Sequence, residues 1–138
     1  HRHGTTFQGF AGNDGIHLTN LQFDNGENWL RGYVLHEMGH SWHNGDDPDQ
    51  EDFQALGGWT QTDPNDAANF TQVGSWWFKT NANFVSAYAK IGWQEDFAES
   101  FSAYFMDQFG WTFYNGGGGA NAAPDKMALI DNFVTSQV

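Results

Sequence analysis

Two histidines stand four residues apart in a segment whose apolar spacing predicts a helix over residues 27–43. Side chains four apart project from the same face of a helix, so the imidazoles of His36 and His40 can share one metal ion. Glu37 follows the first histidine and lies beside the same face. This His-Glu-x-x-His pattern constrains the chain more than any other feature, because it requires a helix, a metal ion and a third ligand from elsewhere.

The residue types in this pattern suit hydrolysis assisted by zinc. Neutral imidazole binds zinc at about 2.0–2.1 Å, and zinc lowers the pKa of a bound water from about 15.7 towards roughly 7. The Glu37 carboxylate can then take the proton of that water as general base. Gly39 carries no side chain, so another backbone or a substrate can approach the helix at that point.

The third ligand is open on the residues alone, with four candidates. His43 and Asp46 follow the helix, and Glu95 and Glu99 stand four apart on one face of a second helix predicted over residues 94–109. Asp46 has the spacing of the last ligand in the longer metzincin pattern, but His43 occupies the position where that pattern has a turn-forming glycine. Of the two glutamates, one can ligate while the other orients a ligating histidine.

Three segments in this order resemble the gluzincin zinc metalloproteases, and among them the catalytic domains of anthrax lethal factor and of the Pro-Pro endopeptidases. The segments are residues 36–40, residues 84–89 and residues 94–101. In those proteins a tyrosine stands seven residues before the ligating glutamate, and Tyr88 and Glu95 have the same separation here. The resemblance covers roughly residues 30 to 110.

The resemblance implies a role for each matched residue. His36, His40 and Glu95 would hold one zinc ion, and Glu99 would hydrogen-bond to His36. Tyr88 would offer its phenol to the oxyanion that forms when a peptide carbonyl is attacked. We therefore expect a zinc-dependent endopeptidase that acts on a peptide or protein substrate.

The expected architecture is a single α+β domain over residues 1–138, of the zincin type, in which a small sheet accompanies the two site helices. Alternating apolar residues predict a strand over residues 16–23, the edge to which an extended substrate would pair. Residues 84–89 are predicted to be a short strand or an extended loop. We also expect a turn over residues 9–16, an acidic loop over residues 44–52, a flexible turn over residues 116–119 and a last helix from Pro124.

Composition excludes several functions and favours one setting. Five Lys and Arg against 17 Asp and Glu give a net charge of −12, which argues against nucleic acid and anionic lipid as partners. Cysteine is absent, so disulfides and thiolate metal sites are excluded, and no apolar run reaches the roughly 18 residues of a membrane span. We expect a secreted, extracellular protein of bacterial type, either a mature domain beginning at His1 or a fragment of a longer chain.

Other functions compete with proteolysis. The chain could be a binding module that keeps a metal without hydrolysing anything, or a structural zinc domain closed by His43 as fourth ligand. A free N-terminus at His1–His3 could chelate copper, and the acidic run Asp46–Asp52 could hold structural calcium. Three tryptophans, if exposed, would form an aromatic wall for extended peptides, and if buried would belong to the core: Trp76, Trp77 and Trp93.

Overall fold

The computed structural model describes residues 9–12, 15–18, 26–42 and 49–136. The helices are α2 (Glu27–Trp42), α3 (Asp49–Gly57), α4 (Trp93–Gln108) and α5 (Pro124–Ser136), joined by the short 3-10 helices η1 (Tyr88–Ile91) and η2 (Gly119–Ala122). The strands form two antiparallel hairpins: β1 (Gly9–Gly12) with β2 (Gly15–Leu18), and β3 (Phe70–Val73) with β4 (Trp76–Lys79). Helices and small sheets together confirm the α+β class.

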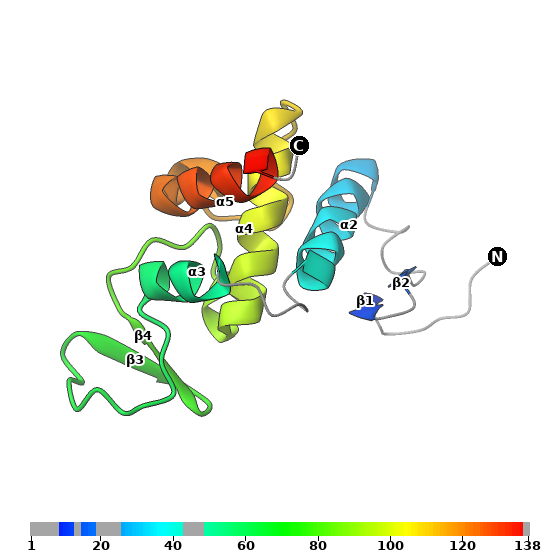
Figure 1. Cartoon of the computed structure of the whole chain (residues 1–138). Coiled ribbons are helices and arrows are strands. Elements are labelled where there is room, and N and C mark those ends of the chain that lie inside the picture. The colour runs from blue at the N-terminus through cyan, green and yellow to red at the C-terminus, as the bar shows by residue number, and fades with distance from the viewer. Residues whose placement is uncertain (1–8, 13–14, 19–25, 43–48, 137–138) are drawn as a thin grey trace.

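Helix α4 is the centre of the arrangement. It runs beside α2 and is crossed by α5, and the β1–β2 hairpin lies against α2 (Figure 1). The β3–β4 hairpin lies on the other side of α4 from α2 (Figure 1). Because α4 is surrounded, most of its side chains are buried, and the face that carries Glu95 and Glu99 is turned towards the histidines of α2.

Helix α2 begins where the sequence predicts. Gly26 has a φ of 93°, a conformation that favours glycine, and its carbonyl accepts the first helical hydrogen bond from Leu30 at 3.0 Å. Glu27 stands in the first turn, where a negative charge is favoured, and pairs with Arg31 one turn on. The helix ends at Trp42, so the prediction over residues 27–43 is confirmed to within one residue.

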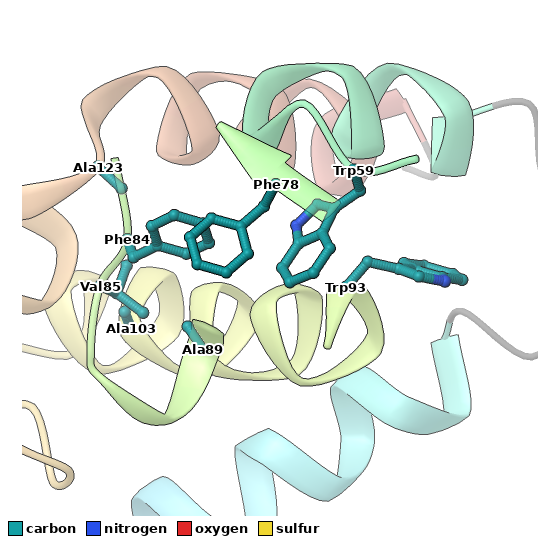
Figure 2. Close-up of a cluster of buried hydrophobic side chains, with 8 residues drawn as sticks. All are labelled: Trp59, Phe78, Phe84, Val85, Ala89, Trp93, Ala103 and Ala123. Atoms are coloured by element: carbon teal, nitrogen blue, oxygen red, sulfur yellow. The ribbon is translucent and has the colours of Figure 1, made fainter. Parts of the chain in front are cut away.

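Two clusters of buried side chains flank α4. The first lies between α4 and the β3–β4 hairpin, and Figure 2 shows its eight members: Trp59, Phe78, Phe84, Val85, Ala89, Trp93, Ala103 and Ala123. The second joins α4 to α3 and α5 and contains Phe53, Phe97, Phe101, Tyr104, Ile130 and Phe133. Each buried aromatic side chain removes a large apolar area from water, so these clusters hold α4 in place on two sides.

A buried ion pair fixes the rotation of α4. Lys126 of α5 and Asp96 of α4 are both fully buried, and Nζ lies 2.8 Å from Oδ2. The indole of Trp59 also donates a hydrogen bond to Asp96, at 2.9 Å, and the Lys126 ammonium lies 3.9 Å from the centre of the Phe84 ring. Since Asp96 is drawn towards α5, the neighbouring Glu95 is directed towards α2.

Gly39 lets α2 and α4 approach closely at the site. A Cβ atom added there would lie 2.9 Å from Ala98 Cα and 3.0 Å from Phe101 Cβ, both on α4. The expectation that another backbone approaches at Gly39 is confirmed, and that backbone is Ala98. The close approach brings the donor atoms of the two helices into contact.

Replacing Gly39 with Ala should destabilise the protein, although Ala is the better helix former by about 1 kcal/mol. Over-packing a tight contact costs about 1–3 kcal/mol, so crowding against Ala98 outweighs the gain in propensity. Urea unfolding measures the change, with Met38→Ala on the exposed side of the same helix as control. A Gly39→Ala variant as stable as the wild type, or more stable, would contradict the tight contact.

Several sequence predictions need correction. Residues 49–52 of the supposed acidic loop belong to helix α3, because acidic residues after Pro48 suit the first turn of a helix as well as a loop. Of the two readings of residues 84–89, the strand is wrong: residues 84–87 form a loop, and residues 88–89 begin the 3-10 helix η1, where the Lys90 N–H donates to the Ala87 carbonyl at 3.1 Å. The supposed turn over residues 9–16 contains strand β1 and the start of β2.

Other predictions are confirmed in part. The strand over residues 16–23 is observed as β2 up to Leu18, and its remainder lies outside the described residues. Helix α4 and helix α5 begin within one residue of their predicted positions. Trp93 is buried and Trp76 packs against the first cluster, so these two belong to the core. None of the helices that the structure describes is long and apolar enough to cross a membrane.

Candidate metal centre

Three donor atoms from two helices meet at one point. His36 Nε2 and His40 Nε2 of α2 lie 3.0 Å apart, and Glu95 Oε2 of α4 lies 3.0 Å and 3.1 Å from them. The atoms form a nearly equilateral triangle whose sides approach the roughly 3.3 Å edge of a tetrahedron with zinc bonds of 2.0–2.1 Å. Among the described residues, His36, His40 and Glu95 are the His, Asp or Glu side chains whose ligand atoms lie close enough together to hold one metal ion.

Glu99 determines which nitrogen of His36 faces this point. Its Oε2 lies 2.9 Å from His36 Nδ1, and both side chains are buried. Nδ1 donates its hydrogen to this carboxylate, so the lone pair of a neutral imidazole is on Nε2 and points at the other two donors. Lone pairs that converge in this way repel one another unless a cation lies between them, so the donor set fits a metal ion.

Three further side chains hold the Glu99 carboxylate. Ser86 Oγ donates to Oε1 at 2.8 Å, Asn115 Nδ2 donates to the same oxygen, and the Tyr114 hydroxyl donates to Oε2. Burial together with the Glu99 charge raises the pKa of Tyr114, so the phenol stays a donor. Burial opposes the charge on Glu99, but the contacts with His36, Tyr114 and Asn115 lower the pKa of this carboxyl and keep it ionised.

Without a metal, a proton supplies the positive charge at this centre. Burial disfavours the imidazolium of His36, but its hydrogen bonds with Glu95 and Glu99 outweigh burial and raise its pKa to about 9. Burial likewise disfavours the Glu95 carboxylate, and hydrogen bonds from His36 and His40 lower its pKa to about 2. A divalent ion would replace the His36 proton, since a ligating imidazole must be neutral.

This exchange predicts opposite effects of alkaline pH on the metal-free and metal-loaded protein. The folded-state pKa of His36 lies above the ordinary histidine value of 6.5, so its contribution to stability is complete below pH 6.5 and is lost towards pH 9. The unfolding temperature of metal-free protein should therefore fall over this range. The increase in unfolding temperature caused by zinc should grow, because no proton then competes for the site. If the unfolding temperature changed with pH in the same way with and without zinc, the proton and the metal ion would not compete for one site.

Glu37 directly follows His36 on α2 and has one oxygen unused. Its side chain is 3% exposed, and among the described residues its Oε2 is the buried side-chain oxygen or nitrogen that has no hydrogen-bond partner. Tyr33 hydrogen-bonds to the same carboxylate, and burial followed by the Glu37 charge raises the pKa of this phenol, which stays protonated. A buried carboxylate oxygen without a partner costs free energy, which a water molecule or a reacting group would recover.

Tyr88 stands at the edge of the centre. Tyr88 is 45% exposed, and its ring centre lies 5.9 Å from that of His36. Burial of the phenol and the nearby Glu95 charge raise its pKa to about 12. It borders a pocket of about 220 Å³ that opens beside His36 and is lined by Trp29, Tyr33, His36, Tyr88, Tyr114 and Asn115.

The residues at this centre that the sequence predicted are His36, Glu37, His40, Glu95 and Glu99, with Tyr88 at its edge. The residues that it did not predict are Tyr33, Ser86, Tyr114 and Asn115. Tyr33 stands three residues before His36, a spacing that places it on the same helix face, so this signal was available. Ser86, Tyr114 and Asn115 follow no spacing that ties them to Glu99 and are brought there by the fold. His43 and Asp46, the other ligand candidates, lie outside the described residues, as do His1–His3 of the copper alternative.

Comparisons with models of known protein families, with curated proteins and with solved structures find no match for this chain.

Proposed function

We propose that the chain is a zinc-dependent endopeptidase of the zincin type, in keeping with its resemblance to the gluzincins. One observation carries the proposal: Glu37, a buried carboxylate with an unused oxygen, directly follows His36 on the helix that supplies two of the three converging ligand atoms. A structural zinc site would be closed by a fourth protein ligand. The unused, buried oxygen of Glu37 on the same helix favours an open position for water and substrate instead.

The proposed roles follow from where each side chain lies. His36, His40 and Glu95 would hold the ion, and Glu99 would keep the lone pair of His36 directed at it. The chemistry that zinc supplies when bound is a lowered pKa of water and polarisation of the scissile carbonyl. Glu37 Oε2 accepts the proton of the attacking water and then gives it to the leaving amine nitrogen.

The two tyrosines near the centre have different proposed tasks. Tyr88 is exposed, and its high pKa keeps the phenol protonated at neutral pH, so it can donate a hydrogen bond to the oxyanion of the substrate. Tyr33 is buried and orients Glu37 through its hydrogen bond. The exposure of Tyr88 leaves room for its hydroxyl to reach the substrate.

The proposal is tested by hydrolysis of a mixed-sequence peptide library, followed by mass spectrometry. We expect internal cleavage by zinc-loaded protein, no cleavage after removal of metal with a chelator, and recovery when zinc is restored. Cleavage that persists without metal would contradict the mechanism. A protein that binds zinc and cleaves no peptide would instead be the metal-containing binding module. The peptide substrate, a secreted extracellular location, bacterial origin and calcium binding stay predictions.

A further inference from the structure

The β3–β4 hairpin takes no part in the proposed catalysis. Its inner face joins the first core cluster through Phe78 and Trp76. Neighbouring residues of a strand point to opposite faces, so Trp77 is on the outer face, directly opposite Gln72 of β3. Figure 1 shows this hairpin on the other side of α4 from the helix that carries the histidines.

A pocket of about 460 Å³ opens on the outer face, within the usual size range of small-molecule sites. Half-buried Trp77 and Phe70 form its apolar part, and its polar part comes from Gln72 and the loop of residues 63–67. None of its lining residues belongs to the metal centre. A large indole left half-exposed beside polar side chains offers a flat surface on which a ring can stack.

The pocket walls are fixed without a ligand. The Trp77 backbone forms two hydrogen bonds with Thr60, at 2.8 Å and 3.0 Å, so the strand that carries the indole is anchored. Asp63 Oδ1 accepts the backbone N–H of Asn65 at 2.8 Å, and Asp66 accepts the side-chain amide of Asn69. A ligand would therefore meet groups already in position, which lowers the entropic cost of binding.

The unused polar atoms indicate what kind of ligand fits. Gln72 donates to Gly74 and leaves its Oε1 as an acceptor, and Asp63 has Oδ2 left. The amide of Asn65 offers both donors and an acceptor. An ammonium group only donates hydrogen bonds, so it would leave the amide donors of the pocket unsatisfied. Asp66, a possible acceptor for it, already accepts two hydrogen bonds from Asn69. Hydroxyl groups donate and accept, so they match this mixture.

We propose that this pocket binds a neutral glycan, with the apolar face of one sugar ring stacked on Trp77. The ring hydroxyls would hydrogen-bond to Asp63, Asn65 and Gln72. Such a site would attach the chain to a polysaccharide or glycoprotein independently of its metal centre.

The test is calorimetric titration of the full chain with chitotetraose, cellotetraose and mannotetraose, and with tetralysine as the cationic alternative. We expect saturable binding of at least one oligosaccharide. Trp77→Ala should weaken it about tenfold or more, and Gln72→Ala should weaken it less. Phe109→Ala removes an exposed aromatic ring elsewhere on the chain and should leave binding unchanged. Thermal unfolding checks that each variant is folded.

Three results would overturn the proposal: no saturable binding of any of the oligosaccharides, equal binding by Trp77→Ala, or Trp77-dependent binding of tetralysine alone. Oligosaccharide binding should be the same in chelator-treated protein and in Glu37→Gln, and Trp77→Ala should keep the peptidase rate on short peptides. The glycan site and the proposed peptidase can therefore fail separately.

Discussion

Glu37→Gln should abolish peptide hydrolysis while leaving zinc in place. Glutamine has nearly the same shape as glutamate, but it cannot accept the proton of the attacking water. General base catalysis typically accelerates a reaction about 10²- to 10⁴-fold, so we expect kcat/KM to fall by about 10²-fold or more. Glu37 is not among the converging ligand atoms, so the zinc content should stay at the wild-type level.

A matched control for this variant is on the same helix. Glu27→Gln makes the same chemical change at an exposed position one turn from Arg31, far from the donors. Its rate should stay within about twofold of the wild type, as for ordinary surface substitutions. If Glu37→Gln keeps substantial activity, Glu37 is not the base. If it loses zinc as well as activity, the side chain has a structural role that its unused oxygen does not indicate.

Glu95→Ala should remove the metal. Two imidazoles alone hold zinc weakly, and a catalytic site needs three protein ligands. We expect about one zinc per chain in the wild type after dialysis and little in the variant. Asp107→Ala, which removes an exposed carboxylate from the same helix α4, is the control and should bind zinc like the wild type.

Glu99→Gln should have a smaller effect than Glu95→Ala. Glu99 hydrogen-bonds to the ligand His36 but is not one of the three metal ligands. The loss of such a partner typically weakens metal binding about 10- to 100-fold. A competition titration against a chromogenic chelator separates the two variants. Full zinc retention by Glu95→Ala would move the third ligand to another residue and remove the main support for the gluzincin resemblance.

The parts of the site on helices were predictable because helical spacing fixes their geometry. A separation of four residues places His36 above His40, and the same separation relates Glu95 to Glu99. Phe97 and Phe101 are also four residues apart on α4, and both lie in the second core cluster. Within each helix, therefore, the sequence was sufficient to name the residues that share a face.

What joins the two helices could be predicted only in part. Gly39 marked a close approach, but its neighbour Ala98 could not be named from the sequence. Tyr114 also depends on a glycine: a Cβ atom at Gly32 would lie 2.3 Å from the Tyr114 ring, so the absence of a side chain there makes room for it. Contacts of this kind depend on the tertiary path of residues 109–123, for which no periodic pattern exists.

The errors in secondary structure have a common physical cause. The charges of α3 were read as a solvated loop, yet this short helix is held by Phe53, which is fully buried against α4 and α5. The segment before α4 was read as extended, yet Val85 and Ala89 are drawn into the first core cluster and the chain turns there. In both places, burial of a few apolar side chains overrides the local composition.

The most direct test of the metal centre is a crystal of zinc-loaded protein measured at the zinc absorption edge. We expect one strong anomalous peak, within bonding distance of His36 Nε2, His40 Nε2 and a carboxylate oxygen of Glu95, with Glu37 beside it and no fourth protein ligand. A peak that includes His43 as a fourth ligand, a peak at another place, or no peak would contradict it.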